Sequence, residues 1–73
     1  MKNPNGVHRF AKHLKKLRNE RGYSQQELAD MANINKKTLQ EIERFKLNPS
    51  LDTLLSLSNA LEIELKELVD FEN

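Results

Sequence analysis

The spacing of apolar residues near the start of the chain predicts an amphipathic helix. From Val7 to about Arg21 apolar residues recur three and four positions apart, which places them on one helical face. They are Val7, Phe10, Ala11, Leu14 and Leu17. Gly22 predicts the end of this helix, because glycine readily adopts the left-handed conformation found after helices. The preceding residues 1–6, MKNPNG, are polar and include proline and glycine, which predicts a flexible N-terminal arm.

The next segment predicts two short helices joined by a tight turn. Ser24 and Glu27 have the spacing of a capping box, in which each side chain accepts a hydrogen bond from a backbone N–H, so a helix begins at Gln25. Asn33 ends this helix, because asparagine tolerates the left-handed conformation that a tight turn needs. The inward face carries Leu28, Ala29 and Ala32.

The second short helix is predicted from Lys36 to about Arg44, with Asn35 as its cap. Leu39 and Ile42 point inward at helical spacing. The outward positions are dominated by long hydrogen-bond donors and are Lys36, Lys37, Gln40, Glu41 and Arg44. Side chains of this kind bond to phosphates and base edges, so this pair of helices has the pattern of a helix-turn-helix DNA reader.

Two further helices are predicted after a loop that ends at Pro49. Ser50 caps a helix from Leu51 to about Leu61. Its apolar face comprises Leu51, Leu54, Leu55, Leu57, Ser58 and Leu61. This face is wider than one core stripe needs, so part of it packs on another helix or is left for a partner. Residues 64–73 are predicted to form a short C-terminal helix, from about Leu65 to Phe71, and a tail; the helix lacks a good cap.

Length and composition indicate one small domain, residues 1–73, near the size at which a single core is only marginally stable. The chain has no cysteine, and His8 and His13 do not share a helix face, so no metal or cofactor is expected. No apolar run is long enough for a signal peptide or a membrane span, so we expect a cytoplasmic protein without a membrane partner.

An enzymatic activity is not expected. Ser24, His13 and Asp30 are the residue types of a hydrolytic triad, but Ser24 is already explained as a helix cap. Two glycines are too few for a glycine-rich phosphate loop. A small all-helical domain also leaves little room for a substrate cleft.

The charge of the chain is divided unevenly along its length. Residues 1–50 hold 11 Lys and Arg against 5 Asp and Glu, whereas residues 51–73 hold 1 against 6, although the whole chain carries only +1. Such runs are often solvated helix faces. The uneven division nevertheless allows the first part of the chain to hold a polyanion while the acidic end faces away.

The segment SQQELADMANINKKTLQEIER, from Ser24 to Arg44, resembles the helix-turn-helix of the phage repressor and Cro type, also called the Xre family. The flanks LKKLRNERGYSQQELA and NPSLDTLLSLSNALEI are similar to the junction before it and to the fourth helix. The resemblance implies a compact, all-α, five-helix lambda-repressor-like domain with the motif at helices two and three. It also implies a homodimer that binds double-stranded DNA at a palindromic operator and regulates transcription, most often as a repressor.

The same resemblance assigns roles to individual positions. Base contacts fall on Lys36, Lys37, Gln40 and Glu41. Phosphate contacts are expected from Gln25, Thr38, Arg44 and Lys46. Arg18 and Glu43 occupy positions where the family often pairs an arginine with a glutamate, and we expect a partly buried pair that fixes how the third helix is presented.

Two residues complicate this assignment. Phe45 stands where the family commonly has glycine; a bulky residue does not easily adopt positive φ, so the exit loop is expected to have a different shape. Glu41 can accept a hydrogen bond from the cytosine amino group, or it can pair with Lys37 one helical turn away, and the sequence leaves both options open.

The surplus leucine face predicts the dimer surface, with Leu55, Leu65 and Leu68 as candidate residues. A controller protein of a restriction-modification system and an Xre-type antitoxin are alternatives within the same class. A protein-interaction module that kept the fold without DNA binding is the alternative from another class, and the basic outward face of the third helix argues against it. An N-terminal domain of a longer regulator is disfavoured by the ending FEN, which has no linker.

Overall fold

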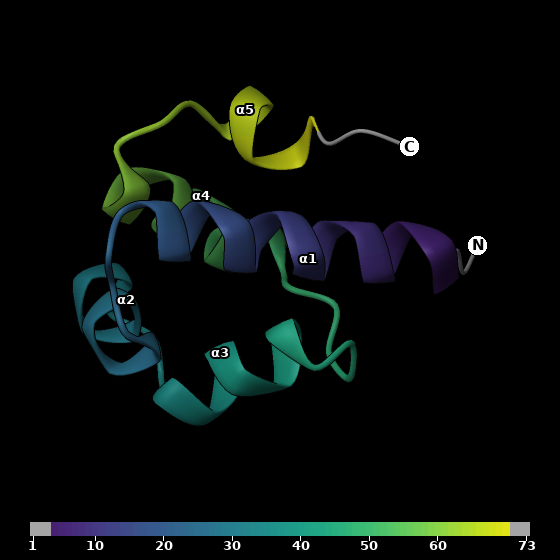
Figure 1. Cartoon of the computed structure of the whole chain (residues 1–73), viewed down its shortest axis with the longest axis horizontal. Coiled ribbons are helices and arrows are strands. Elements are labelled where there is room, and N and C mark those ends of the chain that lie inside the picture. The colour runs from purple at the N-terminus through teal and green to yellow at the C-terminus, as the bar shows by residue number, and fades with distance from the viewer. Residues whose placement is uncertain (1–3, 71–73) are drawn as a thin grey trace.

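A computed structural model describes residues 4–70 and shows five helices (Figure 1). They are α1 (Pro4–Glu20), α2 (Gln25–Ala32), α3 (Lys36–Glu43), α4 (Leu51–Leu61) and α5 (Leu65–Val69). The long α1 crosses the middle of the molecule, with α2 and α3 on one side of it and α5 on the other. α4 packs against α2 and α5. The predicted all-α, five-helix fold is therefore confirmed.

Every helix contributes to one hydrophobic core. Its largest fully buried side chains, each less than 2% exposed, are Leu14, Leu28, Leu39, Ile42, Leu57, Leu61 and Leu68. Burying a side chain of this size contributes about 1.5–3 kcal/mol. Leu68 is 0% exposed, so its prediction as a dimer-surface residue is wrong: this side chain anchors α5 to the rest of the domain.

The predicted helix starts are stabilised by the predicted caps. The Ser24 hydroxyl accepts from the Glu27 N–H at 3.0 Å, and the Glu27 carboxylate accepts from the Ser24 N–H at 2.8 Å. Asn35 accepts from the N–H of Lys37 at 2.8 Å, and the Ser50 hydroxyl accepts a backbone N–H at the start of α4. Each cap satisfies a backbone donor that the helix itself leaves free.

The two terminal helices differ from their predicted bounds or caps. α1 begins at Pro4, ahead of the predicted Val7, because proline suits the first helical position, where no N–H is needed. This shortens the predicted flexible arm, and residues 1–3 lie outside the described range, as does Phe71. At the start of α5, the Glu67 carboxylate accepts from the N–H of Glu64 at 3.1 Å, so this helix has an acceptor at its start that was not predicted.

α1, α2, α3 and α4 end with the same pair of backbone hydrogen bonds. A left-handed residue donates to the carbonyl three positions earlier, and the next residue donates to the carbonyl five positions earlier. The left-handed residues are Gly22, Asn33, Phe45 and Glu62, with φ of 73°, 56°, 66° and 58°. The prediction that Phe45 would reshape the exit loop is therefore wrong. Phe45 and Glu62, which are neither glycine nor asparagine, are disfavoured in this conformation by about 1–2 kcal/mol, and the paired backbone hydrogen bonds offset part of this cost at both positions.

Candidate nucleic-acid interface

α2 and α3 are joined by a short turn and packed on a common core. Asn33 adopts the left-handed conformation, and Ile34 is half-buried and packs against the core from the turn. Leu39 and Ile42, with at most 1% of their surface exposed, hold the inward side of α3. α3 therefore has a rigid apolar base and a free outer side.

The outer side of α3 presents unengaged polar side chains. Lys36 and Lys37 are exposed, and Gln40 and Glu41 are half-buried. Within residues 4–70, none of these four side chains forms a hydrogen bond or an ion pair, so the alternative pairing of Glu41 with Lys37 is not made. Two lysines at a helix N-terminus also oppose the helix dipole, which leaves this end suited to an external anion. The four predicted base-contacting residues are thus available to a ligand.

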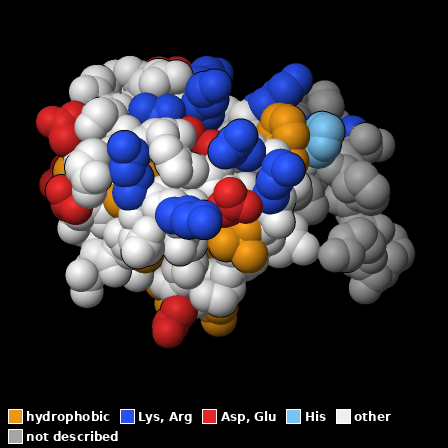
Figure 2. Space-filling model, turned by 90° about the horizontal axis from the view of Figure 1, so that it is seen from below, with side chains coloured by type: hydrophobic (Ala, Val, Ile, Leu, Met, Phe, Trp, Pro, Cys, Tyr) orange, Lys and Arg blue, Asp and Glu red, His pale blue; other side chains and the backbone are white. Residues whose placement is uncertain are grey.

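The surface around α3 is basic. Figure 2 shows the molecule from below Figure 1, the side on which α3 lies, and Lys and Arg side chains gather across it with few acidic ones among them. In the segment around α3 the exposed basic residues are Lys36, Lys37, Arg44 and Lys46. We call these four residues the basic face. They bring a concentrated positive potential to the side of the molecule that carries α3, as a polyanion site requires.

A buried ion pair fixes α3 to α1. The Nε of Arg18 lies 2.8 Å from Oε2 of Glu43, and the Nη2 lies 3.0 Å from Oε1, so the contact is bidentate. The two side chains are 9% and 2% exposed. Arg18 Nη1 also donates to the carbonyl oxygen of Tyr23 at 2.9 Å. The predicted pair is present, and its fork geometry restricts the angle at which α3 is held.

Gln25 joins this pair, which the sequence did not predict. Its Nε2 donates to Oε1 of Glu43 at 3.0 Å, so α2 is tied to the same carboxylate as α1. An amide nitrogen carries two N–H donors, and one remains for the predicted phosphate contact. No sequence signal indicates this bond, because the two residues lie 18 positions apart and meet only when α2 and α3 pack.

The exit loop, residues 44–50, carries two of the predicted phosphate-binding residues. Arg44 and Lys46 are exposed on either side of Phe45. The N–H of Lys46 donates to the carbonyl oxygen of Glu41 at 2.9 Å, which folds the loop back onto the end of α3. Thr38, the remaining predicted phosphate contact on α3, is half-buried. The structure therefore places these residues on or directly beside α3.

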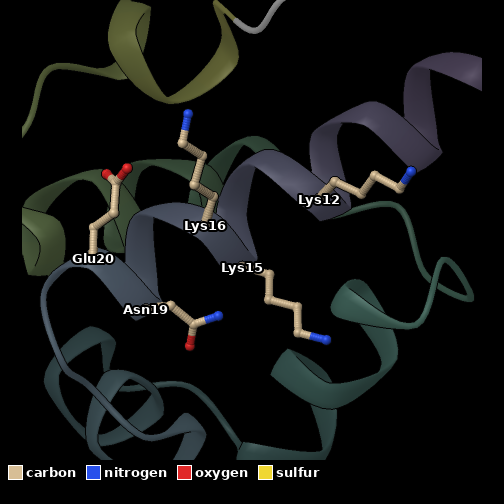
Figure 3. A pocket seen from close by; sticks show the side chains of 5 residues that line it. All are labelled: Lys12, Lys15, Lys16, Asn19 and Glu20. Carbon is tan, nitrogen blue, oxygen red and sulfur yellow. The ribbon is translucent and has the colours of Figure 1, made fainter.

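A shallow depression runs along α1, lined by Lys12, Lys15, Lys16, Asn19 and Glu20 (Figure 3). All five residues come from one helix, so the depression is the side of α1 and not a cleft between elements. In Figure 3 Lys15 points toward α3, whereas Lys16 points toward α5. Lys15 therefore adds positive charge on the side of α1 that faces α3.

The predicted dimer residues lie in different environments. Leu55 is 42% exposed on α4, Leu65 is half-buried against the core, and Leu68 is buried, as described above. Leu51, one helical turn before Leu55, is 63% exposed. Residues four apart share a helix face, so Leu51 and Leu55 form the exposed apolar surface of α4.

The described residues contain no group of three or more His, Asp or Glu side chains able to hold a metal ion. Over the same range, no helix combines the length and the apolar character needed to cross a membrane.

Two known proteins are similar to this chain in sequence. The immunity repressor protein of Bacillus phage phi105 is 41% identical over 59 residues, which is 81% of this chain and 41% of the relative. SinR, an HTH-type transcriptional regulator of Bacillus subtilis, is 40% identical over 58 residues, which is 78% of this chain and 52% of SinR. The chain thus spans about half or less of the length of these curated relatives.

A solved structure shares the fold over nearly its whole length. The restriction-modification controller protein C.AhdI from Aeromonas hydrophila matches with a TM-score of 0.83 and 35% identity, over 85% of this chain and 94% of the controller protein. The HTH_3 family model, described as helix-turn-helix, matches residues 14–68, from the middle of α1 to α5. With most of its residues covered by that model, this chain belongs to the HTH_3, or Xre/Cro-type, helix-turn-helix family of DNA-binding transcriptional regulators.

Proposed function

We propose that this chain binds DNA sequence-specifically as a homodimer and represses transcription from a palindromic operator. The observation that carries the proposal is the outer side of α3, whose long polar side chains have no partner within residues 4–70 and stand on a buried apolar base. A helix presented in this way fits the major groove, which admits one α-helix.

Within the groove, the residues of α3 have distinct chemical roles. Lys36 and Lys37 are suited to the O6 and N7 acceptors of guanine, and Gln40 is suited to N6 and N7 of adenine. Glu41, which has no ion-pair partner in residues 4–70, is suited to the amino group of cytosine. Phosphate contacts come from Gln25, Thr38, Arg44 and Lys46, which orient α3 without reading sequence.

A homodimer is proposed because one small domain makes few contacts with DNA. Two copies related by a two-fold axis double those contacts at half-sites one helical turn apart, about 34–36 Å. Leu51 and Leu55 supply an exposed apolar surface outside the basic face, and the half-buried Leu65 lies on the neighbouring α5. We propose that this surface holds the two copies together.

Repression is the proposed sign of regulation because the relative from Bacillus phage phi105 is an immunity repressor. A controller protein of a restriction-modification system is the second candidate, since C.AhdI is 35% identical and matches 85% of this chain with a TM-score of 0.83. An Xre-type antitoxin has the same DNA-reading chemistry. These alternatives differ in the genes that lie beside the operator, not in the mode of binding.

Selection of bound sequences from random duplex DNA tests the proposal. We expect recovery of a palindrome whose half-sites lie about 10 base pairs apart, centre to centre. A triple variant, Lys36→Ala, Lys37→Ala and Gln40→Ala, should lose the selected sequence while its thermal unfolding stays nearly unchanged. The matched control is Lys66→Ala, which removes an exposed lysine from α5, on the opposite side of α1. Intact DNA selection by the triple variant would reject α3 as the reading helix.

A further inference from the structure

The exit loop depends on a left-handed phenylalanine. Phe45 has φ of 66°, its N–H donates to Ile42 at 3.2 Å, and the next N–H, of Lys46, donates to Glu41 at 2.9 Å. Glycine or asparagine occupies the equivalent position after α1 and α2, and both enter this conformation with less strain. Phe45, like Glu62 after α4, therefore adopts a conformation that its residue type disfavours, and Phe45 also makes a contact with another helix.

That contact is an aromatic stack with α1. The rings of His8 and Phe45 lie with their centroids 4.0 Å apart and an interplanar angle of 18°. His8 is exposed in the first half of α1, and Phe45 is 39% exposed, so the stack lies at the surface and not in the core. Figure 2 shows a histidine side chain against a hydrophobic one at the edge of the basic side chains. The stack joins residues 37 positions apart in sequence and ties the exit loop to α1.

The exit loop that this stack holds carries two cationic side chains to which the proposed function assigns phosphate contacts. Arg44 and Lys46 flank Phe45 directly and are both exposed. A loop that is already ordered loses less conformational freedom when its cations meet phosphates. Fixing the backbone conformation of Phe45 therefore fixes the backbone positions of both cationic residues before DNA binds.

We propose that His8 is a positioning residue for DNA binding: its ring holds Phe45 in the left-handed conformation and so presets Arg44 and Lys46 for the phosphate backbone. The inference rests on the proposed function, since it concerns phosphate contacts of the same interface. It assigns no direct DNA contact to His8. The ring, and not its hydrogen-bonding nitrogens, is the part that acts.

The test is a double-mutant cycle with two readouts. His8→Ala removes the stack, His8→Phe keeps a ring without a nitrogen donor, and Phe45→Gly lets the loop adopt positive φ without a ring. The first readout is hydrogen exchange of the Lys46 amide in the free protein, and the second is operator affinity as a function of salt. His8→Ala should accelerate the exchange about two- to tenfold, the factor expected for loss of one aromatic pair. His8→Phe should restore the wild-type rate.

Operator affinity separates positioning from direct contact. His8→Ala should weaken binding several-fold in the wild-type background but not in the Phe45→Gly background, because its effect passes through Phe45. His8→Phe should bind like the wild type. Equal losses in both backgrounds, with no rescue by phenylalanine, would mean that His8 touches DNA itself and would overturn the inference.

Two further outcomes would also contradict the positioning role of His8. Unchanged exchange in His8→Ala would show that the stack does not hold the loop, and faster exchange with unchanged affinity would show that the loop does not need holding; either result overturns the inference. If the wild type binds no DNA, the proposed function fails and the positioning role fails with it. The exchange rates then still report separately whether His8 anchors Phe45, so the two failures are distinguishable.

Discussion

Replacing Arg18 by alanine should destabilise the domain severely. Arg18 makes two bonds to the Glu43 carboxylate and one to the carbonyl oxygen of Tyr23. Its removal leaves Glu43, whose side chain is 2% exposed, with the amide of Gln25 as its remaining partner in residues 4–70. The variant therefore keeps the buried negative charge of Glu43 and loses the two hydrogen bonds that the carboxylate accepts from Arg18.

The expected loss in the free energy of unfolding follows from the burial of this ion pair. Breaking a buried pair by removing one partner costs about 3–5 kcal/mol. The 9% exposure of the Arg18 side chain allows some water to reach the site, which favours the lower end, about 3 kcal/mol. In a domain of this size 1 kcal/mol lowers Tm by roughly 4–8 °C, so Tm should fall by roughly 12–24 °C.

The assay is urea and thermal unfolding followed by circular dichroism. Lys15→Ala is the control, because this exposed residue lies on the same helix, and it should stay within about 0.5 kcal/mol of the wild type. The double variant Arg18→Met with Glu43→Leu should be more stable than Arg18→Ala, since no unpaired charge stays buried. A loss of less than about 1 kcal/mol in Arg18→Ala, typical of an exposed pair, would refute the reasoning.

Three other predictions concern binding and assembly. Lys37→Ala should relax preference at a single base pair in each half-site, with a discrimination loss of about 1–3 kcal/mol measured by competition between operator variants; a uniform loss over all sequences would make Lys37 a phosphate contact. Arg44→Ala and Lys46→Ala should each weaken binding to all sequences alike and flatten the slope of log K against log salt by about one unit; an unchanged slope contradicts their assignment to phosphates. Leu55→Asp should reduce dimerisation in sedimentation experiments without unfolding the chain, whereas Leu68→Asp, at a fully buried position, should unfold it; a folded Leu68→Asp variant would contradict the core placement.

The sequence by itself determined where most of the helices start and what the third helix presents. Capping requires partners only two or three positions apart, so Ser24, Asn35 and Ser50 were sufficient to predict the starts of three helices. The outward face of α3 was also readable, because helical spacing places Leu39 and Ile42 opposite the exposed lysines. The Arg18–Glu43 pair was predicted from family resemblance, since 25 residues separate its members.

The tertiary structure alone decided which leucines are buried and how the exit loop is held. A leucine-rich helix does not specify which of its residues meet neighbours, so the burial of Leu68 and the exposure of Leu55 depend on how α4 and α5 pack. Local preference argues against a left-handed Phe45, but the stack with His8 brings in a residue that is distant in the chain. Contacts of this kind arise only when α1 and α3 are packed together, because backbone preference is a property of single residues and stacking is a property of the assembled fold.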